Sequence, residues 1–291
     1  MNKINILISI DDSYVEQAID MINSLYMYND CFFNVYLIYS NLSEENIEII
    51  SDFLTTNNIG ELKAYYFDIN KYDFPIYKEY ISVATYLRLF APFIIEDDIN
   101  KILYLDCDII CTNSIIDFYK TPFEGKIIVA CPNLVIKERY FFNINRNIEL
   151  GLPEDNCYVN AGVLLINVKK FKEFTSINEI IKMIEENYEV LYLQDQDVIN
   201  KMFYKKIKIG DIKYNYQING VNYGEELDDF SLIHYSEEDK PWEDSFRNPF
   251  KAFDYYRFLK NKGDTDNLYR LINAHFQNYA QDMFDLIMNE Q

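Results

Sequence analysis

Histidine and cysteine are scarce in this sequence of 291 residues, which contains two histidines and five cysteines. Two histidines exclude a zinc site built mainly from imidazoles. The cysteines form no Cys-x-x-Cys pair, and their odd number argues against a closed disulfide framework. We therefore expect reduced thiols in a cytoplasmic protein.

Long hydrophobic runs are also absent. No apolar run approaches the ~18 residues that a membrane-spanning helix needs. The segment that follows Met1 has one basic residue, Lys3, and Asn5 interrupts its apolar stretch, which is not the pattern of a secretory signal peptide. These absences predict a protein with neither a membrane span nor a secretion signal.

Basic residues are few relative to acids, since 27 Lys and Arg stand against 47 Asp and Glu and give a net charge of −20. Such a field repels polyphosphates, so we expect no nucleic-acid partner. An anionic small ligand would need a cation or a local basic group at its site. Apolar residues make up 49% of the chain and aromatic residues 16%, which excludes a disordered protein.

Short β-branched runs alternate with longer segments of helical period, which is typical of an α/β fold with parallel strands. Strands are predicted at residues 5–10, 32–39, 63–67, 101–105, 126–131, 158–166 and 231–234, and helices at 14–28, 43–54, 79–95, 177–188 and 194–203. The polar stretch of about 25 residues before the strand at 158–166 is predicted to be a long connection of the kind that is usually functional or mobile.

The composition changes near residue 245. Residues 225–244 carry nine acids and one Lys, whereas Phe246–Gly263 carries five basic residues and one acid. We predict a main domain at 1–245 and a helical extension at 246–291. The basic and aromatic start of this extension fits either an anionic membrane surface or a packing helix, and both interpretations stay open at this point.

Two acids, Asp106 and Asp108, follow directly on the strand at 101–105. Positions i and i+2 of an extended segment share one face and lie about 6.6 Å apart, so the two carboxylates can converge on a hard cation such as Mg²⁺ or Mn²⁺. Cys107 between them is expected to point into the core. Two further Asp-x-Asp triplets start at Asp195 and Asp264, so the triplet alone is not specific, and an exposed turn after a strand is the alternative.

A second unusual segment runs from His234 to Trp242, the only tryptophan. An imidazole would complete a site made of two carboxylates, and Lys240 offers a point charge suited to a phosphate. The alternative is a solvated acidic loop whose Trp packs in the core.

Five blocks of the sequence, taken in order, resemble those of glycosyltransferase family 8. The blocks are Ile8–Tyr14, Thr85–Leu89, Leu103–Asp108, Tyr158–Val163 with Asp195–Asp197, and His234–Trp242. Lipopolysaccharide galactosyltransferases and glucosyltransferases and glycogenin-like enzymes are members of this family. The resemblance implies a GT-A fold, which is a mixed, mostly parallel sheet flanked by helices, and a retaining, metal-dependent transfer of a hexose from a UDP-sugar to a glycan or glycolipid.

The resemblance also implies roles for particular residues. Asp106, Asp108 and His234 match the ligands of a divalent metal, Mn²⁺ or Mg²⁺; Asp11, Arg88, Asp106, Cys107, Asn160, Ala161 and Lys240 match donor-binding positions; and Asp195 and Gln196 match the pair under the donor sugar, which we take as catalytic. Glu237 departs from the pattern, because the family often has Gly there. The acceptor implied is a saccharide or a lipid-linked glycan. For such an acceptor, a peripheral contact of the extension with the inner face of the membrane is one expectation.

Two other functions compete with this one. A phosphatase of the haloacid dehalogenase type also places Asp-x-Asp after a hydrophobic strand, but its nucleophile lies on the first strand, whereas Asp106 comes after several βα units. The other is a non-catalytic protein that binds a nucleotide sugar. Asp197 is expected to be a first-turn carboxylate favoured by the helix dipole, and His275 a core residue.

Overall fold

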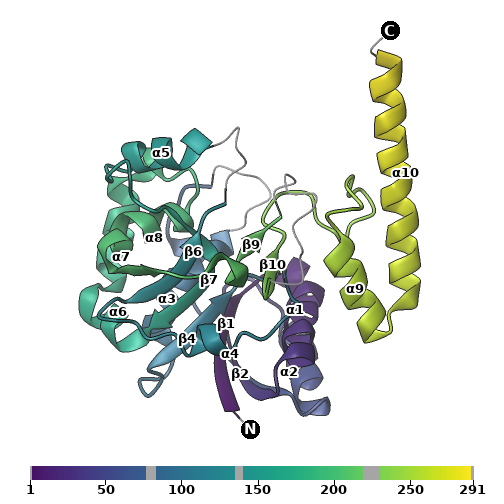
Figure 1. The fold of residues 1–291 in the computed structure, drawn as a ribbon. Coiled ribbons are helices and arrows are strands. Elements are labelled where there is room, and N and C mark those ends of the chain that lie inside the picture. Colours follow the sequence, from purple (N-terminus) through teal and green to yellow (C-terminus); the bar gives the residue numbers. More distant parts are fainter. Residues whose placement is uncertain (1, 77–82, 135–139, 219–229, 290–291) are drawn as a thin grey trace.

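A seven-stranded sheet forms the centre of the molecule (Figure 1). The computed structural model describes residues 2–76, 83–134, 140–218 and 230–289. The strand order is β3-β2-β1-β4-β7-β6-β8, and within it β7 alone runs antiparallel to its neighbours β4 and β6. The strands are β1 Asn2–Ser9, β2 Cys31–Tyr39, β3 Gly60–Tyr66, β4 Lys101–Leu105, β6 Ile128–Pro132, β7 Val159–Asn167 and β8 Ile207–Ile209. This arrangement confirms the mixed, mostly parallel sheet.

Helices flank this sheet. They are α1 Val15–Tyr28, α2 Glu44–Thr56, α3 Leu87–Ile94, α4 Ile116–Tyr119, α5 Tyr140–Glu149, α6 Val168–Phe174, α7 Ile177–Glu186 and α8 Asp195–Phe203. Two further helices, α9 Phe253–Lys262 and α10 Thr265–Asn289, come last in the chain. The helix predicted at 79–95 is shorter, because a 3-10 turn at Val83–Tyr86 precedes α3, and residues 79–82 lie outside the described part. The long connection before β7 contains α5, whose polar composition concealed it.

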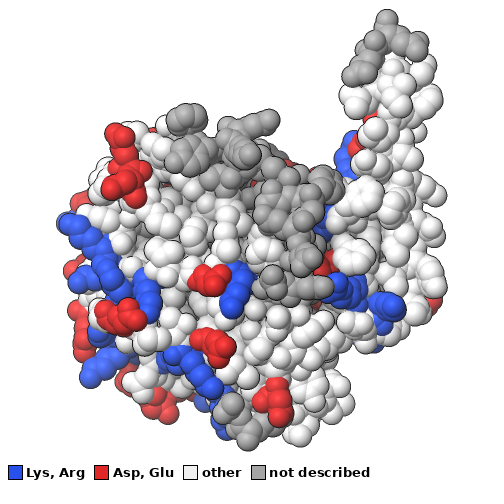
Figure 2. Space-filling model, in the orientation of Figure 1, with Lys and Arg blue, Asp and Glu red and all other residues white. Residues whose placement is uncertain are grey.

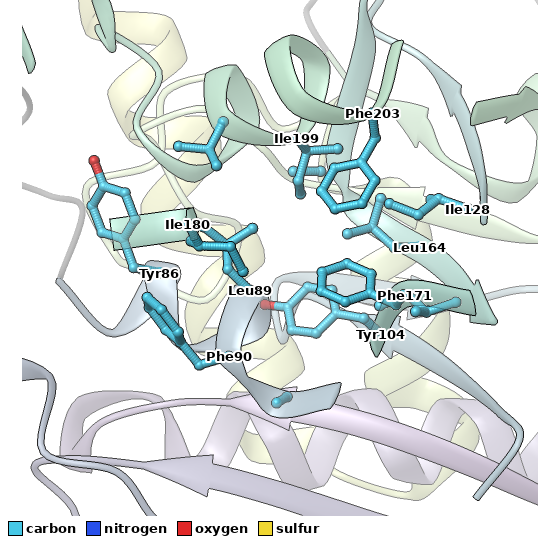
Figure 3. Close-up of a cluster of buried hydrophobic side chains, with 14 of the residues drawn as sticks. Tyr86, Leu89, Phe90, Tyr104, Ile128, Leu164, Phe171, Ile180, Ile199 and Phe203 are labelled. Atoms are coloured by element: carbon cyan, nitrogen blue, oxygen red, sulfur yellow. The ribbon is translucent and has the colours of Figure 1, made fainter. Parts of the chain in front are cut away.

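The strands carry apolar residues on both faces because helices cover both faces of the sheet. On one face, Tyr104 of β4 and Leu164 of β7 pack with Phe90 of α3, Phe171 of α6 and Phe203 of α8 (Figure 3). On the other face, residues of β1 and β4 pack towards α1 and α2, among them Ile6, Ile8, Leu103 and Leu105. The core therefore holds the carboxyl end of β4 between two packed layers.

A smaller sheet, in the order β5-β10-β9, lies beside the end of β4. Its strands are β5 Ile109–Cys111, β9 Tyr216–Gln217 and β10 Leu232–His234. β10 runs antiparallel to β5 with His234 opposite Ile109, and parallel to β9 with His234 opposite Gln217. This pairing brings the end of β10 next to the acids that precede β5.

The residues after 245 form α9 and α10, and α10 extends away from the sheet (Figure 1). Tyr255 and Leu259 of α9 are buried in a cluster with Ile110 and Ile233 of the small sheet. Lys262 forms an ion pair with Asp20 of α1 at 2.8 Å. α9 is therefore a packing helix, which is one of the two interpretations of the segment from Phe246. The division of the chain into domains at residue 245 stays a prediction.

Charge and apolar surface are distributed differently on the two parts. Figure 2 shows basic and acidic side chains interspersed over the body and largely uncharged surface along α10. The distal half of α10 exposes large apolar side chains, namely Phe276, Met283, Phe284, Leu286, Ile287 and Met288. Across the described residues, the chain lacks a helix with the combined length and apolarity that a membrane crossing requires.

Candidate metal and donor site

Three side chains that could hold a metal ion meet at the junction of the two sheets. Asp106 and Asp108 lie in the turn between β4 and β5, and His234 ends β10. Nε2 of His234 is 3.1 Å from Oδ1 of Asp108 and 3.8 Å from Oδ2 of Asp106. One ligand atom from each residue lies within 4.8 Å of the other two. The predicted convergence of these three residues is confirmed.

Each of the two acids uses one oxygen within the protein and turns the other towards the cluster. Oδ1 of Asp106 accepts a hydrogen bond from the Tyr104 hydroxyl at 2.5 Å and pairs with Arg88 Nη2 at 3.0 Å. Oδ2 of Asp108 accepts from Lys240 Nζ at 2.8 Å, whereas its Oδ1 is buried and accepts no hydrogen bond. A buried carboxylate oxygen without a donor needs a partner, and a cation supplies one.

The imidazole of His234 is held in the same way. Its Nδ1 lies 2.8 Å from Oδ1 of Asn215, an atom that can only accept, so Nδ1 carries the proton and donates. In the neutral imidazole the lone pair is then on Nε2, which faces the two acids. One imidazole and two carboxylates fit Mn²⁺ or Mg²⁺ well, and a hydrogen bond on the far nitrogen is the usual support of a metal-binding histidine.

Lys240 acts on Asp108 directly. Its ammonium donates to Asp108 and, at 2.6 Å, to the carbonyl oxygen of Tyr235. Burial alone would raise the pKa of Asp108, but its contacts with the charged Lys240 and with His234 outweigh it and hold the pKa well below the usual range. Asp108 is therefore a carboxylate throughout the neutral range, as a metal ligand must be.

Gly162 leaves the space that this cluster occupies. A Cβ atom added there would lie 2.3 Å from Cε1 of His234 and 2.7 Å from Oδ2 of Asp106. The Gly162 carbonyl accepts a hydrogen bond from the Asp106 amide at 2.9 Å, so β7 runs directly against the turn that carries Asp106 and Asp108. Gly162 lies within one of the matching sequence blocks, but no role was predicted for it. Its contacts with Asp106 and His234 join segments that are far apart in the sequence.

Arg88, predicted to bind the donor, is buried and joins two carboxylates. Its Nη2 pairs with Asp106, its Nε lies 3.1 Å from Oδ2 of Asp195, and its Nη1 donates to the Ala161 carbonyl at 2.9 Å. The guanidinium also lies 4.2 Å from the centre of the Tyr104 ring. Burial lowers its pKa, but Asp106 and Asp195 raise it above the usual range, so Arg88 is a permanent cation between Asp106 of the candidate cluster and Asp195.

Asp195 begins α8 beneath this arginine. Its Oδ1 accepts a hydrogen bond from the Thr85 hydroxyl, while Oδ2 accepts none, because the Nε–H of Arg88 is directed at the Thr85 carbonyl. Burial, opposed by Arg88, raises the pKa of Asp195 to about 6. The preceding residue, Gln194, has φ 53° and ψ −123°, a conformation that costs a non-glycine residue energy and is found at functional sites.

Gln196 is fixed by hydrogen bonds from β7. Its Oε1 accepts from the Asn160 side chain and from the Ala161 amide, both at 3.1 Å. Its Nε2 lies 3.4 Å from the Tyr158 hydroxyl. Both lone pairs of the Gln196 oxygen are thus used within the protein, which leaves Asp195 as the residue of this pair with an unused acceptor oxygen.

The remaining candidates have local structural partners. Asp11 caps the turn after β1 by accepting from the Ser13 amide at 3.1 Å, and the Cys107 thiol is buried in the core, as expected. Glu237 is half-buried in the loop after β10. Asp197 lies in the first turn of α8 but is fully buried and paired with Arg146 at 2.5 Å, so a specific ion pair, beyond the helix dipole, holds it.

Comparison with known proteins identifies the family. The model of Glycosyl transferase family 8 matches residues 5–245, and the chain belongs to this family. Glycosyltransferase GlyF of Streptococcus pneumoniae serotype 4 is 27% identical over 82% of this chain, which spans 57% of GlyF. Lipopolysaccharide 1,2-glucosyltransferase of Escherichia coli is 27% identical over 88% of this chain and 78% of its own length.

Solved structures define the fold. Galactosyltransferase LgtC, determined with donor and acceptor sugar analogues, superposes with a TM-score of 0.76 at 23% identity, covering 90% of this chain and 96% of LgtC. GlyE of Streptococcus pneumoniae gives a TM-score of 0.64 at 22% identity, covering 95% of this chain and 64% of GlyE. The fold is therefore GT-A, as expected. The chain spans less than two thirds of the pneumococcal relatives GlyF and GlyB.

Proposed function

We propose that this chain is a retaining glycosyltransferase that moves a hexose, glucose or galactose, from a UDP-sugar to an acceptor with the help of Mn²⁺ or Mg²⁺. One observation carries the proposal. In each of Asp106, Asp108 and His234, one side-chain oxygen or nitrogen atom forms a hydrogen bond within the protein, and a second oxygen or nitrogen atom points towards a common position. Family membership supports sugar transfer, and the likeness to a lipopolysaccharide glucosyltransferase and to a galactosyltransferase supports a hexose.

The side chains around the cluster suit the cleavage of a bond between a sugar and a phosphate. This cleavage develops negative charge on the leaving diphosphate and positive charge on the sugar ring. A divalent ion held by the three ligands would neutralise the diphosphate, which a protein of charge −20 otherwise repels. Lys240, which pairs with Asp108 at 2.8 Å, is a protein cation beside the cluster that suits this charge.

Asp195 is the residue we assign to the sugar. Its Oδ2 is a carboxylate oxygen that accepts no hydrogen bond, and Arg88 orients it relative to Asp106. A carboxylate beneath the ring stabilises the positive charge of an oxocarbenium-like transition state. Asn160 and Ala161 hold Gln196 beside it, so we assign these three to the sugar pocket.

The acceptor that we propose is a saccharide or a lipid-linked glycan, handled in the cytoplasm. A peripheral contact of the extension with an anionic membrane stays a prediction. Arg247 and Lys262 are engaged by Asp282 and Asp20, and the exposed apolar end of α10 carries Asp282 and Asp285. Cationic side chains strengthen binding to such membranes, so we expect any contact to depend on apolar insertion.

A donor panel tests the proposal. The chain is mixed with Mn²⁺ and each of several nucleotide sugars, and the release of free nucleotide is followed. Slow hydrolysis of one UDP-hexose that requires the cation is the expected result. Tight donor binding without turnover would support the non-catalytic binding protein instead, and release of phosphate from sugar phosphates would support the phosphatase. His234→Ala serves as the metal-site control, and His275→Ala, which removes the other histidine, reports the cost of losing an imidazole elsewhere.

A further inference from the structure

Asn215 connects the metal cluster to the sugar pocket. It lies just before β9, its side chain is fully buried, and the sequence blocks include no part of this loop. Its Oδ1 accepts from His234 Nδ1 at 2.8 Å, and its Nδ2 donates to Oδ1 of Asn160 at 2.8 Å. A single amide therefore contacts both a predicted metal ligand and a predicted donor-binding residue.

The hydrogen bonds continue from there in one direction. Asn160 donates through Nδ2 to Oε1 of Gln196, and its Oδ1 also accepts from the Gly162 amide at 2.8 Å. In each of these side-chain amides the oxygen accepts hydrogen bonds from the metal cluster, from β7 or from the preceding amide. The NH₂ group donates to the next residue of the series. Turning any one of them by 180° would set donor against donor and acceptor against acceptor, so the orientation of the whole series is determined.

We propose that Asn215 is a positioning residue with two separable tasks. Its oxygen keeps the His234 proton on Nδ1, so that the lone pair of Nε2 faces Asp106 and Asp108. Its NH₂ group holds Asn160, and through Asn160 the amide of Gln196, at the sugar. The inference rests on the proposed function, because it assigns a cation to the cluster and a sugar to the pocket.

Two variants separate these tasks. Asn215→Leu removes both hydrogen bonds at similar side-chain size, and loss of an outer partner of a metal ligand typically costs about 10- to 100-fold in metal affinity. Asn215→Asp keeps an acceptor for His234 but places a carboxylate oxygen against Oδ1 of Asn160. We expect the Mn²⁺ dissociation constant of Asn215→Asp to be no higher than about three times that of the wild type, and its kcat to be at least about tenfold lower.

The primary readout is Mn²⁺ binding without donor, measured from the electron paramagnetic resonance signal of the free ion. Asn147→Leu is the matched control, because Asn147 is also buried and hydrogen-bonded, to Asn156, away from the cluster. Thermal denaturation verifies that each variant is folded. We expect the Mn²⁺ dissociation constant to rise about 10- to 100-fold in Asn215→Leu and to stay unchanged in Asn147→Leu.

The outcomes distinguish this inference from the proposed function. If the wild type does not bind Mn²⁺, the proposed function fails. If the wild type binds and Asn215→Leu binds equally well, only the role of Asn215 is overturned. If Asn215→Leu does not fold, the test rests on Asn215→Asp alone. Equal changes in the Mn²⁺ affinity and the kcat of Asn215→Asp would refute two separate tasks, and so would no change in either quantity.

Discussion

Replacing Gly162 with Ala tests the geometry of the metal cluster with one methyl group. The added Cβ would lie 2.3 Å from Cε1 of His234 and 2.7 Å from Oδ2 of Asp106. Both neighbours are predicted metal ligands, and neither is free to move away. His234 is held by Asn215 and by the pairing of β10 with β5, and Asp106 is held by the main-chain bond of its amide to the Gly162 carbonyl.

The size of the effect follows from these distances. Carbon atoms in contact are about 3.5–4.0 Å apart, so the imidazole must withdraw by at least about 1 Å. Metal–ligand distances tolerate deviations of only about 0.2 Å. We expect the Mn²⁺ dissociation constant to rise at least tenfold, comparable to losing an outer partner of a metal ligand, and the free energy of unfolding to fall by about 1–3 kcal/mol through overpacking.

Mn²⁺ titration followed by paramagnetic resonance measures the affinity, and urea denaturation measures the stability. Gly210→Ala is the control, because its Cβ would also meet buried side chains, the nearest atom being Cε2 of Phe118 at 3.1 Å, but would contact no residue of the cluster. Unchanged Mn²⁺ affinity in a folded Gly162→Ala variant would refute the argument, since the two ligands would then not be where the structure has them.

Three further predictions concern the acids and the arginine of the site, and a fourth concerns the stereochemistry of the product. Asp195→Asn should gain stability relative to the wild type as the pH rises from about 4 to 7, because the folded-state pKa of Asp195 is raised from 3.8 to about 6. Over this pH range the free energy of unfolding of the variant, measured by urea denaturation without cation, should rise by about 3 kcal/mol relative to that of the wild type. A stability difference that does not depend on pH would contradict the assignment. Arg88→Met should cost about 3 kcal/mol or more, because it leaves the buried Asp195 and the partly buried Asp106 without their cation. Arg247→Met, which breaks an exposed pair, should cost less than about 1 kcal/mol, and equal costs would be evidence against the role of Arg88. Asp108→Ala should lose donor turnover and raise the Mn²⁺ requirement while the circular dichroism spectrum is retained, and full activity would remove it from the ligand set. The first product, followed by NMR before mutarotation, should keep the anomeric configuration of the donor, and an inverted product would overturn the retaining mechanism.

The order of strands and helices was largely predictable from local patterns. The predicted strands at 5–10, 32–39 and 101–105 correspond to β1, β2 and β4, because β-branched runs of this length suit buried parallel strands. α5 was missed, since three of its ten residues are Asn, which has a low helix propensity, and the small sheet was found only at β10. Short strands of two or three residues leave too little pattern to detect.

The three metal-ligand candidates were also within reach of the sequence, since residue type and position after a strand already set the chemistry that Asp106, Asp108 and His234 offer. The supports of that chemistry came only with the tertiary structure. The contacts of Gly162, Arg88 and Asn215 join residues of different strands and loops, and no local signal encodes them. Hydrogen-bond direction and atomic overlap depend on distances of a few tenths of an ångström, and the pairing of β10 with β5 sets those distances.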